Sequence, residues 1–196
     1  MVKLQAPRVV IFAGPNGAGK STHADAIVDA LGINTFVNAD YIARGLSGHH
    51  VDAVAMQAGR IMLTRLKELA AAKQDFAFES TLSSRSFAPF LRQLKAQGYL
   101  MAIYYFSLTS ASLAVRRVKL RVAMGGHDVP EETVRRRFGR SLRNFHSLYM
   151  PLADRWAVFD NSVTGKAKLI ATQEGDNLQI KEPKPWLKLQ KLLTTC

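Results

Sequence analysis

A glycine-rich segment near the start of the chain carries the residues of a phosphate-binding loop. Gly14, four further residues, Gly19, Lys20 and Ser21 match the pattern G-x-x-x-x-G-K-[ST], directly after the apolar run "RVVIFA". In this pattern backbone N–H groups surround the phosphates, the lysine reaches the terminal phosphates and the hydroxyl holds Mg²⁺. We therefore expect Ser21 to bind Mg²⁺ and the whole loop to bind ATP, through Gly14, Pro15, Asn16, Gly17, Ala18, Gly19, Lys20, Ser21 and Thr22.

A carboxylate follows the second apolar run, in "VNADYIAR", where Asp40 stands. A kinase needs a group that orients and deprotonates the acceptor hydroxyl opposite the γ-phosphate, and the carboxyl end of a strand is a suitable place for it. Asp40 could instead cap a helix that begins at Tyr41, because aspartate is a favoured N-cap. We favour the interpretation that Asp40 is the catalytic base.

Hydroxyl and charged side chains follow the third apolar run, in "FAFESTLSSR". A carboxylate there could hold Mg²⁺ through water or an acceptor hydroxyl, and the hydroxyls and arginine could bind a sugar or a phosphate. Serine runs also form ordinary turns and N-caps. The predicted acceptor-binding residues are Glu79, Thr81, Ser83 and Arg85.

Arginines are concentrated between residues 116 and 143, on both sides of the helix-breaking segment "GGHDVP". This pattern predicts a helical hairpin over about 111–149 that can close as a lid and place arginines over the transferred phosphate. About half of these arginines are expected to face solvent. Arg121 and Arg137, one on each side of the hinge, are the predicted lid arginines; with Lys20 and Asp40 they complete the predicted catalytic set.

The elements that must position these residues alternate in type. Apolar runs at 8–13, 33–38, 75–80 and 99–108 are followed by helical patterns at 20–31, 51–73, 86–97 and 111–124. Such alternation predicts an α/β fold with parallel strands, helices on both faces and ligand loops at the carboxyl ends of the strands.

The remainder of the chain is expected to extend this core. A strand is predicted at 155–160, a strand pair at 167–182 around the turn "EGDN", and an amphipathic helix at 185–193 opened by Pro185. We interpret 1–196 as a single domain, with a core over 8–162, the lid inserted at about 111–149 and a C-terminal extension over 163–196.

Composition limits the setting in which the protein works. Cys196, the only cysteine, has no partner for an internal disulfide, and no apolar run is long enough to span a membrane, so we expect a cytoplasmic protein without a membrane partner. The net charge of +12 favours polyanionic partners. His49 and His50 have too few neighbouring ligands to indicate a metal site.

The spelling "GPNGAGKST" is also common in transporter-type ATPases, but the rest of the chain argues against that class. Such enzymes carry an "LSGGQ"-like signature about a hundred residues after the loop and a strand that ends in Asp-Glu. Here "LSGHH" begins far too soon after Lys20, and "WAVFDNS" ends in a lone Asp160. A kinase is the better interpretation.

On the segments "GPNGAGKST", "NAD", "ESTLS", "RVAMGGHDVPEETVRRRFGRS" and "FDNS", the sequence over about 8–162 resembles the zeta-toxin-like kinases. The resemblance implies a P-loop kinase-like three-layer sandwich with a mainly parallel sheet and a helical-hairpin lid. It also implies phosphorylation of a nucleotide sugar such as UDP-N-acetylglucosamine with ATP and Mg²⁺, and an antitoxin protein as a partner. By this likeness Asp40 is the base, Glu79 and Thr81 lie at the acceptor, and Arg121 and Arg137 are the lid arginines, although the run Arg135 to Arg137 permits a shift of one.

Two other functions stay open from the sequence. One is a kinase for a nucleoside or a nucleic-acid 5′-hydroxyl, which the positive charge could serve; it is not favoured, because the aromatic residues of the hairpin are better explained by packing than by base stacking. The other is a nucleotide-gated binding protein without transfer activity.

Overall fold

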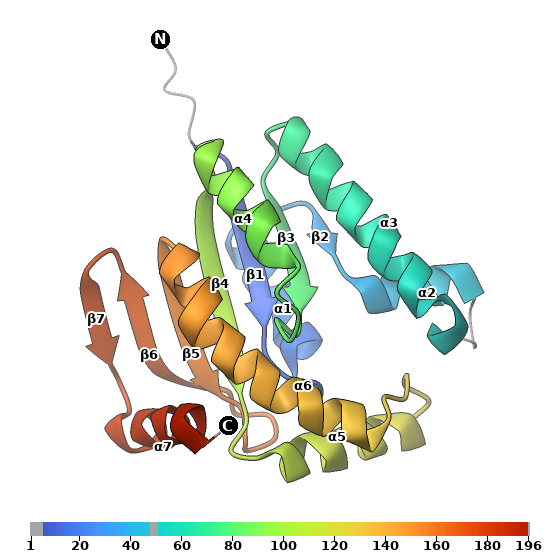
Figure 1. Cartoon of the computed structure of the whole chain (residues 1–196), viewed down its shortest axis with the longest axis vertical. Helices are drawn as coiled ribbons and strands as arrows, with labels where there is room; N and C mark the ends of the chain where they lie inside the picture. Colours follow the sequence, from blue (N-terminus) through green and yellow to red (C-terminus); the bar gives the residue numbers. More distant parts are fainter. Residues whose placement is uncertain (1–5, 48–50, 196) are drawn as a thin grey trace.

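The strands of the computed structural model form one seven-stranded sheet in the order β2-β3-β1-β4-β5-β6-β7 (Figure 1). The structure describes residues 6–47 and 51–195, so His49, His50 and Cys196 lie outside the described residues. Strands β1 to β5 run parallel, and β6 and β7 are antiparallel. Their bounds are β1 Arg8–Ala13, β2 Phe36–Val37, β3 Phe76–Ser80, β4 Leu100–Ser107, β5 Arg155–Asp160, β6 Lys168–Glu174 and β7 Asn177–Ile180.

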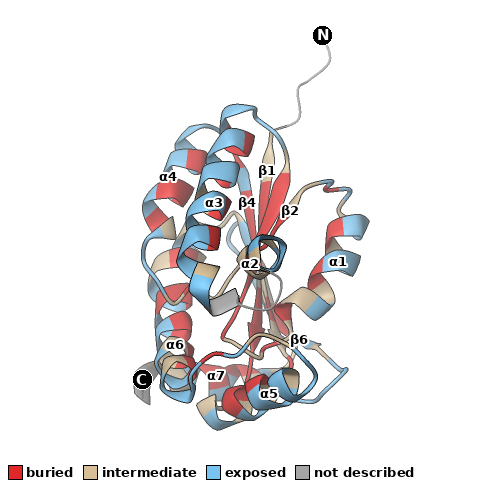
Figure 2. Cartoon of the chain, turned by 90° about the vertical axis from the view of Figure 1, so that its right-hand side faces the viewer, coloured by how far each residue is buried: buried red, intermediate tan, exposed pale blue. Residues whose placement is uncertain are grey.

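Helices cover both faces of the sheet, which gives the predicted three layers. Helix α1 lies on one face and α3, α4 and α6 lie on the other (Figure 2). The helices are α1 Lys20–Ala30, α2 Ala39–Ser47, α3 Val51–Ala71, α4 Phe87–Ala96, α5 Ala111–Ala123, α6 Glu131–Asn144 and α7 Pro183–Thr195. Helix α6 continues into a π-helical turn, Phe145–Tyr149, and a 3₁₀ turn, Met150–Leu152. No helix within residues 6–47 and 51–195 is long and apolar enough to cross a membrane.

Strand β1 occupies the middle of the sheet because it is apolar on both faces. Residues 9–13 are all buried, which suits a strand flanked by parallel neighbours and covered by helices. The ring of Phe12 stacks on Tyr104 of β4 and meets Phe36 of β2 edge-on, each at 5.8 Å between ring centroids. These contacts fix the strand that leads directly into the glycine-rich loop.

The predicted elements are all present, and the largest difference lies near β2. The run at 33–38 yields only Phe36–Val37 as a strand, because this edge strand pairs with β3 at those two positions alone. The helix expected to begin at Tyr41 begins at Ala39 instead. The side chain of Asn38 caps it, since its Oδ1 accepts a hydrogen bond from the Asp40 backbone N–H at 2.8 Å.

The arginine-rich hairpin is present as α5 and α6, joined by residues 124–130. Figure 1 shows α5 below the carboxyl ends of the central strands, the edge where the ligand loops of an α/β sheet gather. The hairpin thus lies next to the glycine-rich loop that follows β1.

The expected strand pair and terminal helix are also present, and α7 begins two residues earlier than predicted, at Pro183. Strand β6 pairs with β5 and β7 pairs with β6, so these two strands continue the core sheet. Trp186 of α7 stacks on Trp156 of β5 at 5.9 Å between ring centroids. This stack holds α7 against the sheet.

Candidate active site

The phosphate-binding loop, residues 14–19 (the P-loop), needs glycine where it turns. Gly14 and Gly19 have φ angles of 138° and 80°, in the region that favours glycine. A methyl group on Gly14 would collide with the carbonyl oxygen of Phe106, and one on Gly19 with the side-chain amide of Asn161. The two glycines are therefore required by the close approach of the Phe106 backbone at one end of the loop and of the Asn161 side chain at the other, and they keep the backbone N–H groups available to phosphates.

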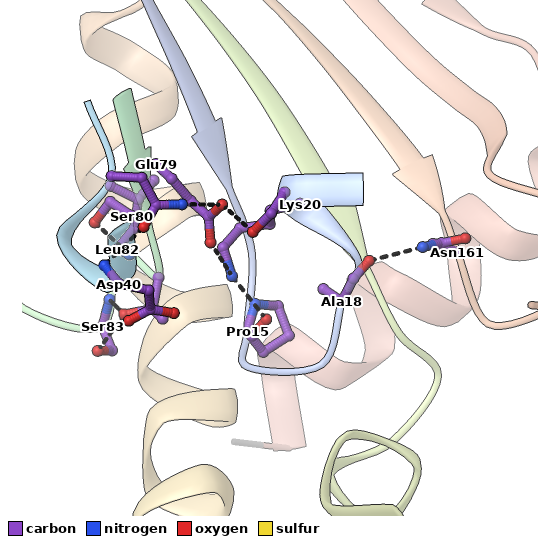
Figure 3. Close-up of polar contacts among 12 residues, drawn as sticks. Pro15, Ala18, Lys20, Asp40, Glu79, Ser80, Leu82, Ser83 and Asn161 are labelled. Atoms are coloured by element: carbon purple, nitrogen blue, oxygen red, sulfur yellow. Dashed lines mark hydrogen bonds and ion pairs between the residues drawn. The ribbon is translucent and has the colours of Figure 1, made fainter. Parts of the chain in front are cut away.

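Glu79 is the centre of the polar contacts that follow the loop (Figure 3). Its Oε2 accepts hydrogen bonds from Ser21 Oγ at 2.6 Å and from Asn38 Nδ2 at 3.0 Å. The buried Lys20 lies with its Nζ 3.4 Å from Glu79 Oε1 and donates to the Pro15 carbonyl at 3.2 Å. The structure thus brings the predicted carboxylate, at the end of β3, together with the predicted lysine and hydroxyl at the start of α1.

This arrangement suits Mg²⁺. The hydroxyl of Ser21 and the carboxylate of Glu79 are hard oxygen donors, which Mg²⁺ prefers. No group of three or more His, Cys, Asp or Glu side chains that could hold a metal occurs in the described part of the chain. Mg²⁺ needs only one or two protein ligands when substrate phosphates and water complete its octahedral shell.

Asp40 lies in the first turn of α2, next to this cluster (Figure 3). Because Asn38 supplies the helix cap, the carboxylate of Asp40 is not used as one. Within residues 6–47 and 51–195 the Asp40 carboxylate accepts no hydrogen bond and joins no ion pair. The structure therefore decides against the capping alternative and leaves a half-buried carboxylate beside the P-loop.

Arg137 is the arginine of α6 that turns inward. Burial lowers the pKa of its guanidinium, Arg136 lowers this pKa further, and the Asp40 carboxylate acts in the opposite direction. Arg135 instead pairs with Glu131 at 2.8 Å, and Arg136 is exposed. Of the three consecutive arginines, Arg137 is thus the one whose charge lies close enough to Asp40 to interact with it.

Arg121 does not lie beside Arg137. Its Nη2 donates to the carbonyl of His127 at 2.7 Å, inside the turn that joins α5 and α6. Its Nε is buried and has no hydrogen-bond partner among the described residues. The lid role of Arg121 stays a prediction, and in this structure its side chain holds the hinge.

The loop after β3 carries the other predicted acceptor residues. The hydroxyls of Thr81 and Ser83 are 2.8 Å apart and hydrogen-bonded to each other. Arg85 is exposed. These hydroxyls follow Glu79 directly, whereas Arg85 is turned to solvent.

Helix α6 and the π-helical turn fasten this loop. Leu82 is fully buried with a φ of 52°, an uncommon conformation for a residue with a side chain. Its carbonyl accepts a hydrogen bond from Asn144 Nδ2 at 2.9 Å, and the Tyr149 hydroxyl donates to the Ser84 carbonyl at 2.5 Å. The element that carries Arg137 therefore also holds the loop after β3.

Two residues that contact the P-loop were missed from the sequence. Asn161 Nδ2 donates to the carbonyl of Ala18 at 2.8 Å. Arg117 of α5 approaches the carbonyl of Gly17 at 3.5 Å and donates to that of Ser162 at 3.0 Å. The signal for Asn161 was the segment "FDNS" at the end of β5, which stood out as a motif without an assigned role; Arg117 had no signal beyond its place in a cluster of arginines.

Comparisons with known proteins agree with this geometry. The family model of the AAA domain matches residues 9–147, which is most of the chain. A curated relative, an uncharacterized protein from Haemophilus influenzae, is 28% identical over 131 residues, which cover 67% of this chain and 92% of the relative.

Solved structures of similar fold include the AvrRxo1-ORF1:-ORF2 complex with ATP, with a TM-score of 0.74 and 14% identity, covering 93% of this chain. This chain spans only 63% of the length of that one. The PezAT chromosomal toxin–antitoxin system of Streptococcus pneumoniae matches with a TM-score of 0.64, 15% identity and coverage of 97% and 79% of the two chains. A gluconokinase from Sinorhizobium meliloti matches with a TM-score of 0.51, 14% identity and coverage of 97% and 93%.

At such identities the solved structures report on the fold. The family match identifies an AAA domain, and the kinases among the structural neighbours share the fold of this chain. The seven-stranded, mostly parallel sheet with its P-loop and helical lid is the α/β sandwich implied by the resemblance to the zeta-toxin-like kinases. The chain belongs to the AAA domain family and has the fold of the P-loop kinases.

Proposed function

We propose that this protein transfers the γ-phosphate of ATP to a hydroxyl of a small acceptor. The observation that carries the proposal is the half-buried carboxylate of Asp40. It is free of the helix cap, lies beside the Lys20–Ser21–Glu79 cluster and faces Arg137 on the lid. Phosphoryl transfer requires a base beside the nucleotide site to orient the acceptor hydroxyl and a cation to stabilise the charge of the transferred phosphate.

In the proposed reaction the acceptor oxygen forms a bond to the γ-phosphorus while the bond to the β,γ-bridging oxygen breaks. Asp40 orients the acceptor hydroxyl and takes its proton, and ADP leaves with the bridging oxygen. Lys20 and Arg137 stabilise the negative charge on the transferred group. Ser21 and Glu79 would hold Mg²⁺, and the ion would neutralise part of the negative charge on the phosphates.

The proposed acceptor is a nucleotide sugar such as UDP-N-acetylglucosamine. The loop after β3 carries groups that suit a sugar and a phosphate. These are the hydroxyls of Thr81 and Ser83 and the exposed guanidinium of Arg85. The net charge of +12 suits an anionic acceptor, and the resemblance to the zeta-toxin-like kinases points to the same compound. This resemblance also supports an antitoxin as a protein partner, as in the PezAT toxin–antitoxin system, and a cytoplasmic setting, where ATP and nucleotide sugars are available.

A panel assay tests the proposal. The protein is incubated with Mg-ATP and nucleotide sugars, nucleosides or 5′-hydroxyl oligonucleotides, and added phosphate is detected by mass. Asp40→Asn should lower transfer by about 10²- to 10⁴-fold, the usual contribution of a general base, and Lys20→Ala should abolish it.

Asp29→Asn, an exposed change of the same chemistry on α1, is the matched control. Transfer that persists at the wild-type rate in Asp40→Asn would refute the assignment of the base. If phosphate were found on an oligonucleotide and on no nucleotide sugar, the assignment as a kinase would stand, but the proposed acceptor would be wrong.

A further inference from the structure

A cavity of about 770 Å³ lies between α7 and the carboxyl ends of β4 and β5. It is on the opposite side of the sheet from the P-loop helix. Phe159 stacks on Phe106, which in turn stacks on His23 of α1, so these rings mark the α1 face. Ser107 and Asp160, the next residues of β4 and β5, point to the other face because side chains alternate along a strand, and both line the cavity.

The wall of this cavity is apolar and its rim is basic. Leu108, Ile170 and Leu189 are buried residues of the wall, and Leu192 and Pro185 extend it along α7. Lys184 and Lys188 also line the cavity and are exposed, four residues apart on the same helix. Residues four apart on a helix lie on one face, so the two ammonium groups share one side of the opening.

The acidic residues of the wall do not neutralise these lysines. Glu182 is paired with Lys168 at 2.6 Å. Asp160 accepts hydrogen bonds from the backbone N–H and the hydroxyl of Ser162, at 2.9 and 2.5 Å. Neither Lys184 nor Lys188 forms an ion pair or hydrogen bond within the described residues, so the rim carries two unpaired ammonium groups.

We propose that this cavity binds a small amphipathic anion, an acyl or aryl group that bears a carboxylate or a phosphate. The apolar wall buries the hydrocarbon part and the two lysines bind the anionic group. The volume falls in the range of about 300–1,000 Å³ that is typical of small-molecule sites. The proposal does not depend on the phosphotransfer activity, because the cavity lies on the face of the sheet opposite α1, the helix that follows the P-loop.

Anilinonaphthalene sulfonate, an aryl anion that fluoresces in apolar surroundings, is a suitable probe for the full-length chain. It should bind at one saturable site, and saturating Mg-ADP should leave this binding unchanged. Decanoate should displace it. The double variant Lys184→Glu/Lys188→Glu should raise its Kd by about tenfold or more, since two attractive charges become repulsive.

Two further variants test whether the probe occupies the cavity itself and whether its binding responds only to the net charge of the protein. Leu192→Trp fills the cavity without changing any charge and should also weaken probe binding. Lys67→Glu/Arg92→Glu reverses two exposed charges on α3 and α4, away from the cavity, and should bind as the wild type does. Thermal unfolding of each variant confirms that it is folded.

Three results would overturn the proposal. Equal probe affinity in the wild type and the Lys184→Glu/Lys188→Glu variant would remove the lysines from the site. Displacement of the probe by Mg-ADP would place it at the P-loop instead. Capture by phosphatidylserine vesicles that requires Lys184 and Lys188, with no displacement of the probe by free decanoate, would assign the lysines to a membrane surface.

Discussion

Removal of the Asn161 side chain is the sharpest test of how the P-loop is held. This amide crosses from the end of β5 to the P-loop, where Nδ2 donates to the carbonyl of Ala18 at 2.8 Å. Ala18 is fully buried and Asn161 is 5% exposed, so water has little access to either group. Asn161→Ala therefore leaves the Ala18 carbonyl without its side-chain donor.

The size of the effect follows from this burial. A buried acceptor that loses its partner costs about 1–3 kcal/mol. If the cost falls on the loop conformation that binds phosphates, the Kd for Mg-ADP rises by about 5-fold to about 150-fold. The lower value applies if water enters the space that the side chain leaves. Asn161→Asp should be worse than Asn161→Ala, because a carboxylate oxygen would then face the Ala18 carbonyl oxygen.

Calorimetric titration with Mg-ADP measures this effect, and thermal unfolding of the same samples separates a local change from global destabilisation. Asn177→Ala, an exposed substitution of the same kind in β7, is the control and should bind as the wild type does. A folded Asn161→Asp variant with wild-type affinity for Mg-ADP would show that the P-loop keeps its conformation without this bond.

Three other predictions follow from contacts around the site. Asn144→Ala removes the donor to the buried Leu82 carbonyl and should cost about 1–3 kcal/mol; faster hydrogen exchange confined to residues 81–86 is the expected readout, and unchanged exchange there would contradict it. Gly19→Ala should abolish Mg-ADP binding in titrations, because its methyl group meets Asn161, whereas Gly32→Ala, with a φ of 63° and open space around it, should keep this affinity and lose only about 1 kcal/mol of stability. Burial raises the pKa of Tyr149 to about 12 in the folded protein, above its ordinary value near 10, so its contribution to the free energy of unfolding is complete below pH 10 and is lost as the pH rises toward 12; denaturant unfolding of Tyr149→Phe between pH 9 and 12 should show a shallower loss, and a slope equal to the wild type would refute this account.

Much of the fold could be predicted because local patterns determine it. The apolar run at 8–13 is β1 without a change of boundary, and the hairpin is interrupted where two glycines and a proline break the helical pattern. The strand near 33–38 was predicted too long. Its apolar residues satisfy a strand pattern, but only two of them find hydrogen-bond partners on β3.

Within the site, spacing alone identified the residues of the P-loop and of the helix start that follows it. Gly14, Gly19, Lys20 and Ser21 are close in sequence, so their geometry is fixed by one loop and one helix start. The role of Asp40 could not be separated from capping, because that depended on whether Asn38 or Asp40 occupied the cap position.

The sequence by itself determined that this protein has a P-loop, an α/β sheet and an arginine-bearing helical hairpin, since each is written in a contiguous pattern of residues. Only the tertiary structure decided which side chains meet. It turned Arg137 toward Asp40 while Arg121 remained in the hinge, and it brought Asn161 to the P-loop from more than a hundred residues away. The physical reason is that a neighbouring helical residue differs by a rotation of about 100°, and a strand end meets a distant loop only when the sheet order places them side by side. A local sequence pattern specifies neither the direction in which a helical side chain faces in the fold nor the order of the strands in the sheet.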